Sequence, residues 1–205
     1  YVVVPALAGK ELRDLLKQGS GNGLAPALVV QIFRQLLAGL GAVHDAQVVH
    51  RDLKPENVFV LAGGDHEVRL MDFGVAKPSD EGGQDIDVYR SLNIQVGGSP
   101  AYIAPESISS DPIDGRTDLY SLGVMLFEML TGKLPLESET TQGFLTQHLI
   151  SPPMTLAEAS PDFAWPAGLE HLVARMLAKG KTERPGSCAE ISALLDAGLA
   201  QEIEN

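Results

Sequence analysis

Apolar residues recur along the chain with a helical period in two long segments. The first follows Pro26, which suits the first turn of a helix, and its apolar residues recur every three or four positions. The second, residues 118–130, is apolar on nearly every side, which is typical of a helix buried in the middle of a domain. Asp118 is predicted to cap its amino end. The stripe of the first helix consists of Leu28, Ile32, Phe33, Leu36, Leu37, Leu40 and Val43.

Two amphipathic helices are predicted near the carboxyl end of the chain. The first is followed by Gly180, which favours a helix end. The second is predicted to begin with a capping box formed by Ser187 and Glu190. The two apolar sides consist of Leu169, Leu172, Val173, Met176 and Leu177, and of Ile191, Leu194, Leu195 and Leu199.

Short β-branched runs predict the strands. Residues 1–4 are predicted to be a buried strand end, halted by a proline. Residues 58–61 and 68–71 are separated by a Gly-Gly turn and predict a β-hairpin. Such a hairpin would place Asn57 at one foot and Asp72 at the other. The pattern as a whole predicts an α+β fold that is mostly α.

Composition and charge narrow the class of protein. The chain has 205 residues, of which 44% are hydrophobic, and this is enough for one substantial core. A net charge of −12 argues against nucleic acid or an anionic membrane as a partner, because both bind positive surfaces. The single cysteine, Cys188, cannot form an internal disulfide, which favours a reducing, cytoplasmic location. No run of about eighteen apolar residues occurs, so no membrane segment is predicted. Trp165 and Cys188 are expected in the core.

Three short motifs occur in the order and spacing of a known family. Residues 50–57 read H-R-D-L-K-P-E-N, residues 72–74 read D-F-G and residues 104–106 read A-P-E. Together they resemble the eukaryotic-like Ser/Thr protein kinases. The segment Q-H-x-x-x-P-P at residues 147–153 and the E-R-P at residues 183–185 are similar to the bacterial, Hanks-type members.

The resemblance implies a catalytic and a metal-binding set of residues. Asp52 would orient and deprotonate the substrate hydroxyl, and Lys54 would contact the γ-phosphate. Asn57 and Asp72 would hold Mg²⁺ or Mn²⁺. Ser99 belongs to a G-S-P-A-Y sequence that resembles the loop receiving the phosphoacceptor, and its hydroxyl would bridge Asp52 and Lys54. This loop and Lys54 imply a protein substrate with a Ser or Thr acceptor.

The resemblance also implies an ATP site at the start of the chain. The carbonyl of Pro5 and the N–H of Leu7 would face adenine, and Phe59 would pack under the ring. Glu11 stands where kinases contact the ribose. A carboxylate at a helix start, favoured by the helix dipole, is an equally good interpretation of Glu11.

Further residues match the structural positions of the family. His50 and Phe73 belong to the two active-site motifs. Asp118, at the start of the buried helix, would hold the backbone of H-R-D. Arg184 would pair with Glu106 of A-P-E.

A regulatory role is implied for two cations. Arg51 and Lys77 match the residues that grip a phosphorylated activation loop in many kinases. Ser91 is the nearest hydroxyl before the acceptor loop and is our hypothesis for the phosphorylated residue. Alternatively, Arg51 and Lys77 pair with carboxylates of this acidic loop, and the enzyme does not depend on loop phosphorylation.

The match covers the large lobe of the kinase fold, beginning at the hinge, over about residues 1–199. The 205 residues contain no G-x-G-x-x-G-x-V and no V-A-I-K lysine. We therefore expect the small lobe upstream of this chain, and weak or no activity from the chain alone. An active kinase, a truncated pseudokinase that serves as a binding scaffold, and a small-molecule phosphotransferase are the three competing interpretations. The last is weakened by Lys54, the A-P-E and the acceptor loop.

Overall fold

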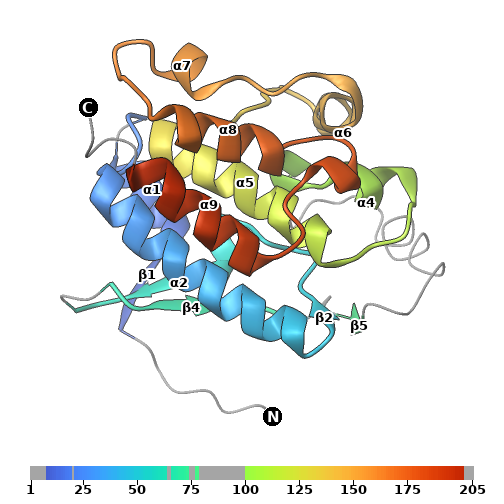
Figure 1. Ribbon diagram of the computed structural model, residues 1–205, viewed down its shortest axis with the longest axis horizontal. Coiled ribbons are helices and arrows are strands. Elements are labelled where there is room, and N and C mark those ends of the chain that lie inside the picture. The colour runs from blue at the N-terminus through green and yellow to red at the C-terminus, as the bar shows by residue number, and fades with distance from the viewer. Residues whose placement is uncertain (1–7, 20, 64–65, 74–76, 79–99, 201–205) are drawn as a thin grey trace.

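The computed structural model of the chain describes residues 8–19, 21–63, 66–73, 77–78 and 100–200, and Figure 1 shows their arrangement. The helices are α1 (Leu12–Gln18), α2 (Pro26–Asp45), α4 (Pro105–Ser109), α5 (Gly115–Thr131), α6 (Thr141–Ile150), α7 (Leu156–Ala159), α8 (Ala167–Met176) and α9 (Cys188–Ala200). Three short 3-10 helices are η1 (Pro55–Asn57), η2 (Pro100–Tyr102) and η3 (Lys181–Glu183). The strands are β1 (Gly9–Glu11), β2 (Val48–Val49), β3 (Val58–Leu61), β4 (Val68–Leu70) and β5 (Lys77–Pro78).

Helix α5 is the centre of the fold, as its apolar pattern predicts. Every residue from Thr117 to Thr131 is buried, and α2, α7 and α8 all contact the helix. The predicted start of this helix is wrong. It begins at Gly115, and its cap is Asp114, whose Oδ1 accepts from the N–H of Arg116 at 2.8 Å. Asp118 is in the first turn instead, and its carboxylate accepts from the N–H groups of His50 and Arg51.

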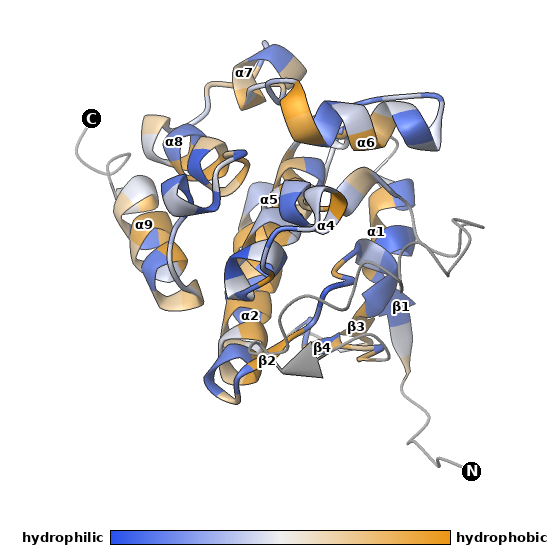
Figure 2. Cartoon of the chain, turned by 90° about the vertical axis from the view of Figure 1, so that its right-hand side faces the viewer, coloured by the Kyte–Doolittle hydropathy of each residue, from blue (hydrophilic) through white to orange (hydrophobic). Residues whose placement is uncertain are grey.

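Helix α2 begins with Pro26 at its first turn, as predicted. Its apolar stripe packs against α5 and α9, and both α2 and α5 are strongly apolar in colour (Figure 2). In the described ranges α2 is also the one helix that is long and apolar enough to cross a membrane. The core helix of a soluble protein passes the same test, so this finding is weak evidence for a span. The predicted absence of a membrane segment therefore stays a prediction.

Helices α8 and α9 pack closely at two glycines. A Cβ on Gly168 would lie 2.5 Å from the Cα of Gly198. The capping box predicted for α9 forms only in part. The Ser187 hydroxyl accepts from the N–H of Glu190 at 3.1 Å, but the Glu190 carboxylate accepts from Gly186, at 2.7 Å, one residue before the predicted partner. Glu190 also binds Arg175 at 2.9 Å, which fixes its side chain from the other side.

The strands form two small antiparallel sheets. β1, β3 and β4 form a sheet in the order β1-β3-β4, and β3 and β4 are the predicted hairpin, with Val60 opposite Val68. β2 and β5 form the second sheet, with Val49 opposite Lys77. The buried strand end predicted for residues 1–4 lies outside the described residues. The α+β fold with a majority of helix is confirmed.

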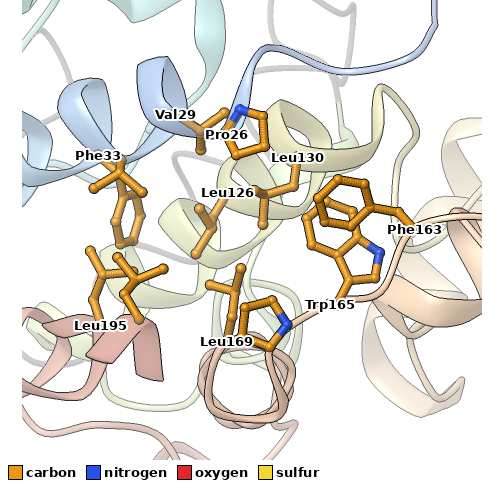
Figure 3. Close-up of a pocket in the computed structure, with 12 residues that line it drawn as sticks. Pro26, Val29, Phe33, Leu126, Leu130, Phe163, Trp165, Leu169 and Leu195 are labelled. Carbon is orange, nitrogen blue, oxygen red and sulfur yellow. The ribbon is translucent and has the colours of Figure 1, made fainter. Parts of the chain in front are cut away.

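An apolar pocket lies between α2, α5, α8 and α9 (Figure 3). Phe163 and Trp165 line one side of it, with ring centroids 4.2 Å apart. Both Trp165 and Cys188 pack against the core, as predicted, and burial raises the pKa of Cys188 to about 12. No acidic or basic side chain lines this pocket, so the pocket offers no group for acid–base catalysis.

Candidate active site

The loop at residues 50–57 is anchored by one buried carboxylate. The Oδ2 atom of Asp118 accepts from the N–H of His50 at 2.9 Å, and its Oδ1 accepts from the N–H of Arg51 at 2.8 Å. The Nε2 atom of His44 lies 2.8 Å from Oδ2. Asp118 is completely buried, and such a charge is tolerated only when it is hydrogen-bonded. The predicted contact between Asp118 and the H-R-D backbone is therefore present, and it holds Arg51 in a left-handed conformation with φ 68°.

Two polar side chains of this loop bond to Asp52. Lys54 Nζ donates to Asp52 Oδ2 at 2.6 Å. Asn57 Nδ2 donates to the same oxygen at 3.0 Å and to the Asp52 carbonyl at 2.7 Å. Asn57 is buried, so these bonds fix the Asp52 side chain. A carboxylate held through Oδ2 can still accept a proton at its other oxygen.

The second motif is joined directly to this loop. The N–H of Met71 donates to the carbonyl of Asn57 at 2.8 Å, so the predicted hairpin brings Asn57 and Asp72 to neighbouring positions. His50 Nε2 bonds to the Met71 carbonyl at 3.0 Å, and the rings of His50 and Phe73 lie 4.7 Å apart. Asp72 has φ 56°, a conformation uncommon outside glycine, which turns the chain at this point.

The donors at this position fit a hard divalent cation. Asn57 uses its amide nitrogen toward Asp52, so its amide oxygen is the end that would bind a metal, together with the Asp72 carboxylate. In the described part of the chain no three His, Cys, Asp or Glu side chains cluster as a metal site. Mg²⁺ commonly takes only one or two protein carboxylates, and water and phosphate oxygens complete its shell. The residues present therefore fit Mg²⁺ or Mn²⁺ held jointly with a nucleotide.

Two of the predicted nucleotide contacts lie side by side on the sheet. Glu11 of β1 is the register partner of Phe59 of β3. Glu11 precedes α1, but its side chain makes no capping hydrogen bond, and it is exposed. Its position at the start of α1 agrees with the helix-dipole interpretation, and its position beside Phe59 agrees with the nucleotide interpretation, so both interpretations stay open. Pro5 and Leu7 lie outside the described residues.

The end of the acceptor segment is fixed by a buried ion pair. Arg184 Nη1 and Nη2 donate to Glu106 Oε1 and Oε2 at 2.7 and 2.9 Å, as the sequence predicts. Thr117 of α5 also donates to Glu106 Oε1, at 2.8 Å. The remaining Arg184 donors bind the carbonyls of Arg116, Ala178 and Lys179. Both charged groups are buried and fully hydrogen-bonded, which is the condition for burying such a pair.

A second ion-pair network was not predicted from the sequence. Arg13 of α1 donates to Glu56 at 2.8 Å and to Glu128 of α5 at 2.7 Å, and its third partner is the Tyr102 hydroxyl. The Tyr102 hydroxyl donates to Glu128 Oε2 at 2.5 Å. Burial and the charge of Glu128 raise the pKa of Tyr102, so it stays protonated. The network joins the catalytic loop, η2 and α5, and nothing in the local sequence around Arg13 indicates it.

The predicted regulatory residues are described only in part. Ser91 and Ser99 lie outside the described residues. The backbone of Lys77 belongs to β5 and pairs with that of Val49. Val49 precedes Arg51 by two residues. This register brings the backbones of the two predicted cation positions close together.

Lys54 and Asn57 bond to Asp52 on the H-R-D loop, and this loop is joined to the strand that leads into D-F-G, so the structure brings the two protein-kinase motifs together. The family model described as protein kinase domain matches residues 1–195, so the chain belongs to the protein kinase domain family. Proteins of this family use ATP and a divalent metal.

The curated relatives that resemble the chain include bacterial serine/threonine-protein kinases. The chain is similar to the serine/threonine-protein kinases pkn2 and Pkn1 of Myxococcus xanthus, at 36% identity over 96% and 99% of its length. It is similar to the serine/threonine-protein kinase PknD of Mycobacterium tuberculosis, at 34% identity over 94% of its length. The matches span 23%, 28% and 27% of those relatives, so the chain covers about a quarter of their length.

Proposed function

We propose that this chain is the large lobe of a bacterial protein kinase that transfers the γ-phosphate of ATP to Ser or Thr hydroxyls of a protein. The observation that carries the proposal is the position of Asp52. Its carboxylate is fixed by Lys54 at 2.6 Å and Asn57 at 3.0 Å, on a loop whose backbone is held by Asp118. Phosphoryl transfer depends mostly on such positioning.

Each side chain of this group has a distinct task in the proposed reaction. Asp52 orients the acceptor hydroxyl and takes its proton. Lys54 stabilises the negative charge of the transferring phosphoryl group. Asn57 and Asp72 hold Mg²⁺ or Mn²⁺, which neutralises phosphate charge when it is bound with ATP. By the family resemblance, Ser99 would bridge Asp52 and Lys54, and Pro5, Leu7, Glu11 and Phe59 would contact the nucleotide.

The two competing functions have less support. A pseudokinase scaffold has no need of an aspartate, a lysine and an asparagine assembled around one carboxylate oxygen. A small-molecule phosphotransferase has no need of an acceptor loop that Arg184 and Glu106 fix at its end. Since the chain carries a net charge of −12, we propose protein and not nucleic acid as the partner. We propose a cytoplasmic location for this domain because its single cysteine cannot form an internal disulfide.

We further propose that a small lobe, supplied upstream, covers the active site. Two large apolar side chains at the D-F-G are exposed, Met71 by 39% and Phe73 by 43%. Exposed apolar residues next to an active site favour contact with another unit. The missing Gly-rich loop and lysine would come with that lobe.

Residues 1–205 alone are expected to transfer phosphate far more slowly than the full-length protein in which the small lobe precedes them. The reason is that the chain lacks the lysine and the loop that position the β- and γ-phosphates. Radiolabel transfer from ATP to a basic protein such as histone would measure both rates, with Asp52→Asn in each protein as the blank. A rate of about 1 to 100 s⁻¹ from the chain alone would refute the proposed division.

Ser91 is the proposed phosphorylated residue of the activation segment, gripped by Arg51 and Lys77. In the full-length protein, Ser91→Ala is expected to lower transfer, because a charge-assisted contact that orders the loop is lost. Phosphopeptide mass spectrometry of the active protein supplies the second measurement. Full activity of Ser91→Ala, together with no phosphate between residues 72 and 98, would favour pairing of the cations with loop carboxylates.

A further inference from the structure

The Q-H-x-x-x-P-P segment contains a buried histidine that no step of the proposed reaction uses. His148 of α6 is completely buried. Its Nδ1 lies 2.8 Å from the Tyr120 hydroxyl of α5, and its Nε2 lies 3.0 Å from the Ala101 carbonyl of η2. The side chain therefore joins three separate elements of the fold.

Hydrogen-bond chemistry fixes the tautomer of His148. A carbonyl oxygen can only accept, so Nε2 must carry the proton that binds Ala101. Nδ1 is then an acceptor, and the Tyr120 hydroxyl donates a hydrogen bond to it. Lys179 Nζ in turn donates to the Tyr120 oxygen at 3.4 Å and to the Gln147 carbonyl at 3.3 Å. The hydrogen bonds are thus all donated in one direction, from Lys179 to Tyr120, from Tyr120 to His148 and from His148 to Ala101.

Burial and the nearby charge of Lys179 keep this histidine neutral. Burial, followed by the charge of Lys179, lowers the pKa of His148 to about 4, although the bond to Ala101 opposes this shift. Burial also raises the pKa of Tyr120, so its proton stays available. Arg184 lies over the Tyr120 ring, 4.7 Å from its centroid, and links this chain of donors to the ion pair with Glu106.

The acceptor of the final bond belongs to the loop that would receive the substrate. Ala101 follows Ser99 by two residues in the G-S-P-A-Y sequence. The next carbonyl along the chain, that of Tyr102, accepts from the Ser121 hydroxyl at 2.7 Å. Two successive carbonyls of η2 are thus held by side chains of α5 and α6. Figures 1 and 2 place α6 far from the β1-β3-β4 sheet that carries the proposed nucleotide contacts.

We propose that His148 is a positioning residue for the acceptor loop, which sets the affinity for the protein substrate and leaves the affinity for ATP unchanged. The inference rests on the proposed kinase function. Among the described residues, His148 contacts Tyr120, Ala101 and Phe144, and none of these belongs to the catalytic loop or to the proposed nucleotide contacts. Its Nε2–H holds the Ala101 carbonyl, and the loop that carries this carbonyl binds the acceptor segment of the substrate.

The pair of variants His148→Asn and His148→Gln tests the inference in the full-length protein. An Asn side chain places its amide near the Nδ1 position and keeps the Tyr120 contact but loses Ala101. The longer Gln side chain reaches the Nε2 position and can donate to Ala101. We expect His148→Asn to raise the KM for a protein substrate about tenfold, because the Ala101 carbonyl loses the hydrogen bond donated by His148. His148→Gln is expected to stay near the wild-type KM, and the KM for ATP to stay unchanged in both.

His171 supplies a matched control, since it is an exposed histidine on α8. His171→Asn is expected to change neither KM. Equal substrate KM values for His148→Asn and His148→Gln would overturn the inference, and so would a parallel rise of the ATP KM. These outcomes require an active wild-type protein, so a wild type that transfers no phosphate overturns the proposed function instead.

Hydrogen exchange decides the positioning role without any assay of activity. The N–H of Ile103 closes η2 by donating to the Pro100 carbonyl at 3.4 Å. In His148→Asn this amide is expected to exchange about tenfold faster than in His148→Gln, because η2 has lost one of its side-chain anchors. Equal exchange in the two variants would overturn the inference even in an inactive protein.

Discussion

Asp52→Asn in the full-length protein is expected to lower phosphate transfer by roughly 10²- to 10⁴-fold, the usual range for loss of a general base. Nucleotide affinity should stay nearly unchanged. The Asp52 carboxylate is held by Lys54 and Asn57 and lies on the acceptor side of the site in our proposal. An asparagine can keep the shape of the side chain but cannot take the hydroxyl proton. Radiolabel transfer measures the rate, and calorimetry at fixed Mg²⁺ measures the affinity.

Asp72→Asn is the matched variant for this measurement. It removes one charge, as Asp52→Asn does, but from a residue proposed to bind the metal. We therefore expect weaker binding of the metal-nucleotide complex as well as slower transfer. If both variants bind the nucleotide equally well, the proposed division between base and metal ligand is wrong.

Arg184→Met is expected to lower the free energy of unfolding by about 3–5 kcal/mol, the cost of leaving one charge of a buried pair without its partner. Glu106 would keep only Thr117 as a side-chain donor, and three backbone carbonyls would lose the guanidinium. Urea unfolding followed by the fluorescence of Trp165, the single tryptophan, provides the measurement.

An exposed pair provides the control for Arg184. Arg34 and Asp196 are bonded at 2.6 Å, with side chains 53% and 58% exposed, and such pairs contribute about 0–1 kcal/mol. Arg34→Met should therefore cost little. The double variant Arg184→Met with Glu106→Leu should recover part of the loss, because no unpaired charge remains. A cost for Arg184→Met no larger than that for Arg34→Met would show that the buried pair does not hold this segment.

The local features of the active site were predictable, because short sequence spacings determine them. Asn57 and Asp72 had to meet once the two β-branched runs between them formed a hairpin, and the bond between Met71 and Asn57 shows that they do. The buried helix was recognisable because its own residues are apolar on nearly every side. Its first residue was not, because Asp114 and Asp118 can both cap a helix. The contact of Asp118 with the catalytic loop was expected from the family resemblance and is present, but which of the two aspartates caps the helix was not predicted.

The contacts that sequence reasoning missed connect residues far apart in the chain. Arg13 and Glu128 are 115 positions apart, and His148 and Ala101 are 47 positions apart. Neither arginine nor histidine shows from its neighbours whether it is exposed or buried. The same limit applies to the capping box at α9, where Glu190 bonds to Gly186 and Arg175. A complete box forms instead at Thr155 and Glu158.

Phosphoamino-acid analysis of a protein labelled by the full-length kinase tests the proposed function most directly. The label would come from the γ-phosphate of ATP, and wild type would be compared with Asp52→Asn. Our account predicts label on phosphoserine or phosphothreonine of the protein substrate with the wild type, and almost none with Asp52→Asn. Label that appears equally with both proteins, or on no protein at all, would contradict it.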